Sequence, residues 1–196
     1  MAEWLGGMSG SSAILLGIIV GLMMCADMGG PINKAAYLFA TAGLSTGDEA
    51  SMQVMAAVMG AGMVPPLALA LSSALRPKLY TQAERENGKA GWLLGASFIS
   101  EGAIPFAAAD PLRVIPSIMA GGAVTGALSM AFGAASRAPH GGVFVFFAID
   151  NVLGWFAAII AGAIVGAVLV SALKQLWPRK VAAAPAGTPA ATAASA

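Results

Sequence analysis

The chain has 196 residues, of which 58% are hydrophobic and only 10% are charged, and its formal net charge is +1. A soluble domain carries about 25% charged residues because its surface must face water, so this composition excludes an ordinary soluble protein and predicts an integral membrane protein. The charge balance favours no nucleic-acid partner, and the single cysteine, Cys25, excludes an intrachain disulfide and a four-cysteine zinc site. We predict no metal ion and no cofactor.

The first apolar segment is interrupted by polar and helix-breaking residues. Residues 13–26 are apolar but fall short of the about 20 residues that a helix needs to cross a bilayer, and the sequence DMGGPINK separates them from apolar residues 35–44. Such breaks are typical of transporter binding sites, because non-helical backbone at membrane depth must be satisfied by protein or by water in a cavity. Asn33 has donor and acceptor atoms that suit a sugar hydroxyl, whereas Asp27 and Lys34 favour a structural ion pair with each other.

Three segments without charges are long enough to span a membrane, namely 51–75, 114–135 and 152–173. The Pro65-Pro66 pair predicts a kink in the first, because proline lacks a backbone N–H and clashes with the preceding turn. The last has Gly or Ala at every fourth position from Gly154 to Gly166, which predicts close packing against another helix. Packing within the chain is favoured, and a dimer interface is the alternative.

Basic residues predict how these segments are oriented. They gather in residues 76–89 and 174–180, and the positive-inside rule places both regions in the cytoplasm. An even number of crossings must separate the two regions, and the segments 114–135 and 152–173 provide them. The apolar segment 90–109 therefore fits a re-entrant hairpin that returns to the side from which it entered.

Glu101 lies inside the apolar segment 90–109. Placing a carboxylate in such a segment costs roughly 2.5–3.5 kcal/mol on membrane-insertion scales, so Glu101 is a functional candidate. Gly102 and Pro105 follow it and break the helix, which leaves backbone groups free to bind a ligand. A structural ion pair and a position at the membrane interface are the alternatives.

His140 is the only histidine, and it lies in the sequence RAPHGG between two apolar segments. A histidine that is merely solvated in a loop is one interpretation. The flanking Pro139, Gly141 and Gly142 favour a loop of defined, inward-folded shape, in which His140 could reach a ligand.

Four longer motifs stand out beyond these single residues. They are GGPINKAAYLF (29–39), GAGMVPPLA (60–68), FISEGAIPFAAADP (98–111) and APHGGVFV (138–145). In order and spacing they resemble the fructose-specific EIIC subunit of the bacterial phosphoenolpyruvate-dependent phosphotransferase system. The resemblance implies that fructose is bound from outside, carried inward and phosphorylated to fructose 1-phosphate. The donor in that family is a phosphocysteine of the EIIB domain, which receives phosphate from EIIA and, indirectly, from HPr.

The resemblance also implies roles for particular residues and partners. The acidic segment of the family falls on Ser100, Glu101 and Gly102, which are therefore candidate substrate-binding residues. Glu101 is also the candidate catalytic base that deprotonates the attacking hydroxyl. Asn33 and His140 match motif positions and are further substrate-binding candidates. The implied partners are fructose or a related sugar such as mannitol, membrane lipid, and a second copy of the chain in a homodimer.

The predicted fold class is all-α, a polytopic protein of the bacterial inner membrane with broken helices and a re-entrant hairpin. Residues 1–180 are expected to be the C-terminal half of an EIIC domain, with the N-terminal half as a missing partner, and residues 181–196 a disordered Ala/Pro-rich tail. The chain lacks the phosphorylated cysteine loop of EIIB, so it is expected to serve a transferase system without carrying the phosphoryl donor. An ion-coupled secondary sugar transporter and an inactive truncated remnant are the alternatives.

Overall fold

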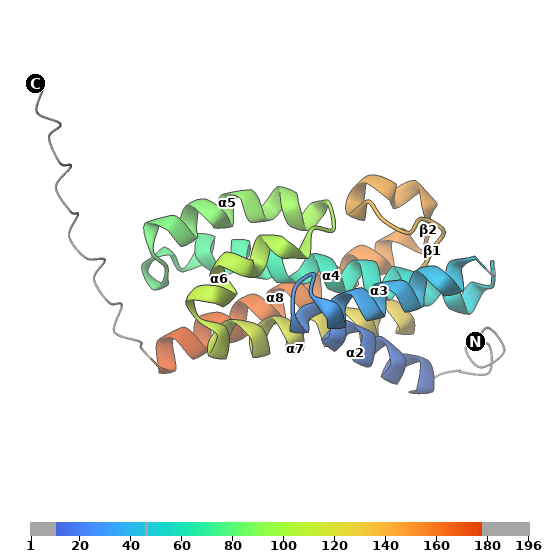
Figure 1. The fold of residues 1–196 in the computed structure, drawn as a ribbon, viewed down its shortest axis with the longest axis horizontal. Coiled ribbons are helices and arrows are strands. Elements are labelled where there is room, and N and C mark those ends of the chain that lie inside the picture. The colour runs from blue at the N-terminus through green and yellow to red at the C-terminus, as the bar shows by residue number, and fades with distance from the viewer. Residues whose placement is uncertain (1–10, 46, 178–196) are drawn as a thin grey trace, which may run out of the picture.

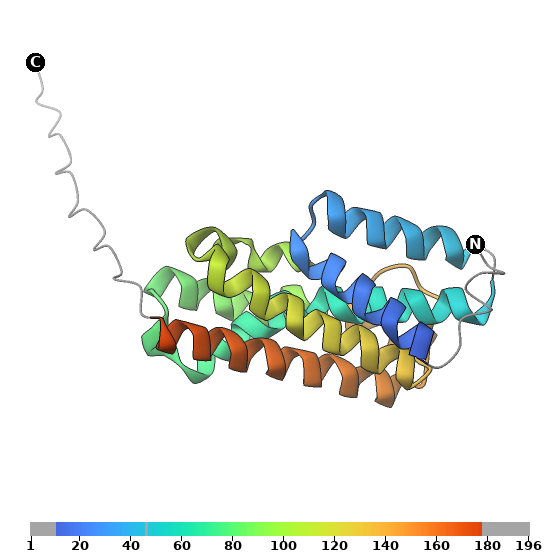
Figure 2. The same ribbon diagram turned by 90° about the horizontal axis from the view of Figure 1, so that it is seen from below.

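The computed structural model describes residues 11–45 and 47–177, which form an elongated bundle of helices (Figures 1 and 2). The predicted tail, residues 181–196, lies outside the described residues. In chain order the elements are α2 (Ser11–Ala26), α3 (Pro31–Leu44), α4 (Glu49–Leu75), η1 (Pro77–Leu79), α5 (Gln82–Ala96), η2 (Ser100–Ala103), α6 (Ile104–Ala109), α7 (Pro111–Ala131), β1 (Ala135–Ser136), η3 (Gly142–Ala148), β2 (Ile149–Asp150) and α8 (Val152–Leu176). The all-α prediction is confirmed, since the two short strands pair only with each other.

Three helices, α4, α7 and α8, are long and apolar enough to cross a membrane. They coincide with the three predicted spans, although α7 ends at Ala131 and not at residue 135. The helix stops there because Gly133 has a φ of +63°. The Gly133 and Ala134 N–H groups then donate back to the carbonyls of Met130 and Ser129, which is the Schellman ending that glycine favours.

The long helix α4 lies at the centre of the bundle and continues through the Pro65-Pro66 pair. Because proline has no N–H, the carbonyls of Ala61 and Gly62, four residues earlier, have no helical donor. The Cys25 thiol of α2 donates to the Ala61 carbonyl at 3.4 Å. The Ser100 hydroxyl of η2 donates to the Gly62 carbonyl at 2.7 Å. The proline pair therefore creates two acceptors that fasten other segments to α4.

Two helical hairpins enter the bundle from opposite ends. The first consists of α2 and α3, and the second of α5 followed by η2 and α6; their tips meet near the middle of the bundle (Figures 1 and 2). The predicted re-entrant segment 90–109 belongs to the second hairpin. Its first helix begins earlier, at Gln82, because the side chains of Thr81 and Glu84 form a capping box there.

Glycines allow the helices to approach closely. A Cβ on Gly17 or Gly21 of α2 would overlap the backbone of Gly126 or Gly122 of α7, so these two helices touch without intervening side chains. A Cβ on Gly162 of α8 would likewise overlap a backbone carbonyl of α7. The prediction that the small-residue face of α8 packs within the chain is therefore confirmed.

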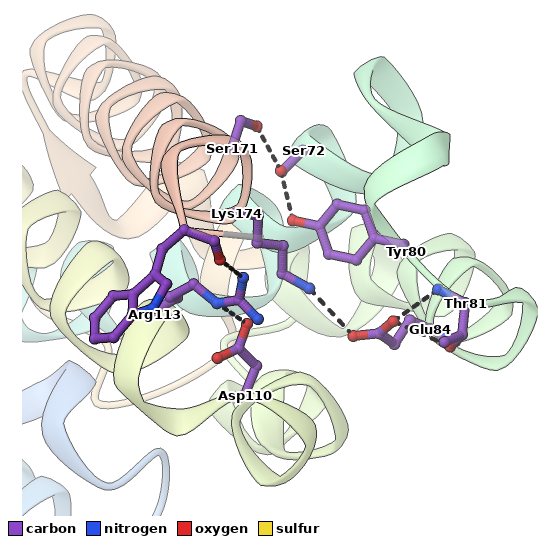
Figure 3. A network of polar contacts seen from close by, with 9 residues as sticks. Ser72, Tyr80, Thr81, Glu84, Asp110, Arg113, Ser171 and Lys174 are labelled. Carbon is purple, nitrogen blue, oxygen red and sulfur yellow. Dashed lines mark hydrogen bonds and ion pairs between the residues drawn. The ribbon is translucent and has the colours of Figure 1, made fainter. Parts of the chain in front are cut away.

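Buried polar side chains close the end of the bundle at which α4 and α8 finish (Figure 3). Lys174 Nζ lies 3.3 Å from Glu84 Oε1, and Arg113 Nε lies 2.5 Å from a carboxylate oxygen of Asp110. These four side chains are only 6–11% exposed. Together with Tyr80, whose ring centre is 4.0 Å from Lys174 Nζ, we call them the end cluster. Residues 76–89 and the described part of the second basic region, residues 174–177, which were predicted to share one side of the membrane, thus do lie at one end.

Candidate functional site

A cavity of about 480 Å³ lies where the tips of the two hairpins meet. It receives side chains from α3, from the segment between α5 and α6, and from the loop that precedes η3. The lining residues are Met24, Gly29, Asn33, Lys34, Tyr37, Phe98, Ile99, Ser100, Glu101 and His140. Four predicted site residues, Asn33, Ser100, Glu101 and His140, are therefore brought together from three separate parts of the chain.

The tip of the first hairpin is held by Asp27. Its carboxylate accepts hydrogen bonds from the backbone N–H groups of Ile32 (2.7 Å) and Asn33 (2.9 Å) at the start of α3. The first N–H groups of a helix have no acceptor within the helix, and the Asp27 carboxylate supplies one here. No ion pair joins Asp27 to Lys34 in the described part of the chain, so the expected structural pair is wrong. Lys34 instead lines the cavity.

The side chain of Asn33 also stabilises the tip of the first hairpin. Its amide nitrogen donates to the carbonyl of Met24 at 2.7 Å, in the last turns of α2, and the residue is buried. Its side-chain oxygen has no hydrogen-bond partner among the described residues. Asn33 can therefore tie α3 to α2 and still offer an acceptor to a ligand in the cavity.

The tip of the second hairpin carries Ser100 and Glu101. The Ser100 hydroxyl is buried and bound to Gly62 of α4, so it fixes the position of its neighbour. Phe98, just before them, has a φ of +63°, a strained conformation of the kind that gathers at ligand sites. Glu101 is exposed. The hairpin places its carboxylate at a tip that faces the cavity.

The two tips touch at Gly29, whose φ is +104°. A Cβ at this position would lie 2.5 Å from Glu101 Oε1. Only a glycine allows both the backbone conformation and the close approach of the carboxylate. The first hairpin therefore forms part of the immediate surroundings of the acid on the second.

Aromatic rings form one wall of the cavity. The ring of His140 lies with its centre 4.9 Å from that of Phe98 and 6.4 Å from that of Tyr37. The His140 loop is held in place because Gly142, at a φ of +59°, packs directly on the Ala96 carbonyl at the end of α5. The sequence interpretation of an inward-folded loop therefore describes this segment well, although the His140 side chain itself stays exposed.

Gly102 is the one candidate that does not line the cavity. It packs between Leu94 of α5 and Pro66 of α4, where a Cβ would lie 2.9 Å from a Leu94 carbon. Its place in the structure is that of a spacer that lets η2 approach α4.

Lys34, Tyr37 and Phe98 line the cavity but were not among the predicted site residues. Tyr37 follows Asn33 by one helical turn and therefore lies on the same face of α3. This position could have been predicted from the sequence if residues 31–44 had been treated as one helix. Phe98 has a strained backbone conformation that no sequence pattern predicts. All the lining residues together give the cavity one carboxylate, one ammonium, an amide, an imidazole and an aromatic wall. This set is suited to a small polyhydroxylated molecule.

The chain is similar in sequence to several known proteins. It is 52% identical over 178 residues to a PTS system fructose-specific EIIB'BC component of Escherichia coli (strain K12), an alignment that covers 89% of the chain and 31% of the relative. It is 54% identical over 184 residues to a PTS system fructose-specific EIIC component of Haloferax volcanii, covering 93% and 48%. It is 45% identical over 175 residues to a fructose permease IIC component of Bacillus amyloliquefaciens, covering 89% and 56%.

The chain is homologous to part of the fructose-specific EIIC components. This confirms the resemblance that the four motifs indicated. The chain spans between 31% and 56% of the length of these three relatives. EIIC homology and the three apolar helices together identify a multi-pass membrane protein. No family model matches the chain, and no solved structure matches it.

Proposed function

We propose that the chain is the sugar-binding and translocating part of a fructose phosphotransferase system, located in the inner membrane. The observation that carries the proposal is the cavity, in which Asn33 and Glu101 converge from the two hairpins and His140 from the loop before η3. The cavity is within the range of about 300–1,000 Å³ that is usual for small-molecule sites. The names of the relatives, which are fructose-specific components and a fructose permease, support the choice of sugar.

In this proposal Glu101 accepts hydrogen bonds from sugar hydroxyls and takes the proton of the hydroxyl that is phosphorylated. Asn33 offers its side-chain oxygen to a second hydroxyl. His140 and the aromatic wall pack against the C–H face of the sugar, and His140 can also bind a hydroxyl. Ser100 acts through Glu101 as a positioning residue, because its own hydroxyl is bound to Gly62.

The proposed partners are EIIA and EIIB domains. A relative from Bacillus subtilis, 45% identical over 175 residues, is named a PTS system fructose-specific EIIABC component, and the Escherichia coli relative is named EIIB'BC. A phosphocysteine of EIIB is the proposed donor, so the chain contributes the acceptor site of a transferase system. We further propose that residues 1–180 are the C-terminal half of an EIIC domain, that the N-terminal half completes it, and that the assembly is a homodimer.

The proposal is tested in membrane vesicles that contain the chain, co-expressed with an N-terminal EIIC half and supplied with EIIA, EIIB, HPr and phosphoenolpyruvate. We expect radiolabelled fructose to enter and to be recovered as fructose 1-phosphate. Accumulation of unmodified sugar, driven by an ion gradient, would show a secondary transporter instead. Absence of both uptake and sugar binding in this complete system would identify an inactive remnant. An excess of unlabelled mannitol distinguishes a fructose-selective site from a broader one.

A further inference from the structure

Lys34 is a charge that the proposed sugar contacts do not use. It lies in the first turn of α3, where its N–H donates to the Gly30 carbonyl. A cation near the N-terminus of a helix is disfavoured by the helix dipole. The local structure therefore does not account for a lysine at this position.

Lys34 also differs from three other basic residues of the bundle. Lys174, Arg113 and Arg137 each have a carboxylate partner, namely Glu84, Asp110 and Asp150. No ion pair joins Lys34 to an acid within residues 11–45 and 47–177. Its side chain is exposed and lines the same cavity as Glu101. The cavity thus holds one ammonium and one carboxylate that come from opposite hairpins and form no ion pair with each other.

We propose that Lys34 is the phosphoryl-binding residue of the cavity, an inference that rests on the proposed function. A sugar that is phosphorylated in place brings two changes of charge to its site. A hydroxyl loses its proton, which needs a carboxylate, and a phosphoryl group with negative oxygens arrives, which needs a cation. Glu101 and Lys34 meet these two requirements separately, because an ammonium bound to Glu101 would be lost to the phosphoryl group.

The proposed transfer moves the phosphoryl group from the donor sulfur to a sugar oxygen. The phosphorus–sulfur bond of the donor thiophosphate breaks, and a phosphorus–oxygen bond to the sugar hydroxyl oxygen forms. The hydroxyl proton passes to the Glu101 carboxylate, and the donor leaves as a thiolate. Lys34 donates hydrogen bonds to the non-bridging phosphoryl oxygens during the transfer and to the sugar phosphate afterwards.

Direct binding separates Lys34 from a general role in sugar recognition. The full chain, assembled with its N-terminal half in lipid nanodiscs, is titrated with fructose and with fructose 1-phosphate. We expect Lys34→Gln to leave the Kd for fructose within about twofold and to weaken sugar phosphate binding by about tenfold or more, as for the loss of one charge-assisted hydrogen bond. Lys34→Arg, which keeps the charge, should restore part of the affinity for the phosphate alone. Phosphoryl transfer from EIIB should slow in Lys34→Gln by a similar factor.

Lys89→Gln is the matched control, because Lys89 is exposed outside the cavity and pairs with Glu86 at 2.8 Å. It should change neither affinity. An unchanged sugar phosphate affinity in Lys34→Gln, with the unsubstituted chain binding both ligands, overturns the role of Lys34 and leaves the proposed function standing. Equal weakening of both ligands would also overturn it, as a sign of general disruption. Failure of the unsubstituted chain to bind either ligand instead overturns the proposed function and this inference together.

Discussion

The cavity and the end cluster both place charges in an apolar bundle, but they treat those charges in opposite ways. In the end cluster, Lys174 and Glu84 are buried and in contact, and so are Arg113 and Asp110. In the cavity, Glu101 and Lys34 are exposed and have no ion-pair partner among the described residues. A charge that is already neutralised can hold helices together, whereas a charge left accessible can bind a ligand. The sequence alone marked Glu101 as a functional candidate, but it did not show that Lys34 has no ion-pair partner in the described part of the chain or that the four charges of the end cluster are paired.

The physical reason lies in desolvation. A buried charge costs several kcal/mol to remove from water, and a close partner offsets most of this penalty. The end cluster offsets it within the protein, so removal of one partner should damage the fold. The cavity leaves the interaction to be made by the substrate, so removal of its charges should damage function. Substitutions in the two regions test that division.

Glu101→Gln should lower phosphorylation-dependent fructose uptake by about 100-fold or more, the range for loss of a general base. Membrane insertion and thermal stability should be unchanged, because the side chain is exposed and has no ion-pair partner in the described residues. Uptake is measured in vesicles and stability by the thermal midpoint in detergent. Glu49→Gln, an exposed acid at the start of α4, is the control and should behave like the unsubstituted chain.

Lys174→Met should lower the free energy of unfolding by about 3–5 kcal/mol, because Glu84 is left buried without a counter-charge. The uptake per folded molecule should stay the same, since Lys174 is remote from the cavity. Unfolding by denaturant in detergent micelles measures the first quantity. The double variant Lys174→Met with Glu84→Gln should recover much of the stability. A loss of uptake in the fully folded fraction would contradict the division between the two regions.

Ser100→Ala should reduce both stability and uptake. The Gly62 carbonyl loses its donor, which costs about 1–3 kcal/mol for a buried group, and Glu101 loses the anchor beside it, which should slow uptake roughly ten- to hundredfold. Adding Pro66→Ala supplies a helical N–H to the Gly62 carbonyl. The double variant should therefore recover stability but not uptake. Recovery of both would show that Ser100 has no role in positioning Glu101.

The smallest effect concerns pH and the end cluster. Burial raises the pKa of Tyr80 from 10.0 to about 12, with nearby Glu84 and Asp110 adding to the rise and the hydrogen bond with Ser72 opposing it. The folded state thus holds this proton more tightly than the unfolded state, so its contribution is full below pH 10 and is lost as the pH rises towards 12. The thermal midpoint should fall over this range by more than in Tyr80→Phe. Identical pH profiles would contradict the assignment.

Much of the fold could be predicted because membrane helices leave a strong local signal. Long apolar segments predicted α4, α7 and α8, and the distribution of basic residues predicted that the second hairpin returns to its own end. The boundaries were less accessible. The end of α7 depends on the backbone conformation of Gly133, and the role of Pro65-Pro66 depends on donors 36 and 38 residues away along the chain.

The candidate site could be predicted in its members but not in its geometry. Asn33, Glu101 and His140 were chosen from their residue types and surroundings and Ser100 from the family motif, and all four line the cavity. Lys34 was assigned to a structural ion pair with Asp27, the acid in the same polar break. In the structure the Asp27 carboxylate instead accepts hydrogen bonds from backbone N–H groups. Lys34 therefore forms no ion pair with Asp27 and lines the cavity.

By itself the sequence determined membrane residence, the three long apolar helices and the homology to EIIC components. These follow from hydrophobicity and motif identity, which are properties of consecutive residues. Only the tertiary structure decided which charges are neutralised and which face a cavity. That outcome depends on how two hairpins from opposite ends meet on α4, and therefore on distances between residues far apart in the chain.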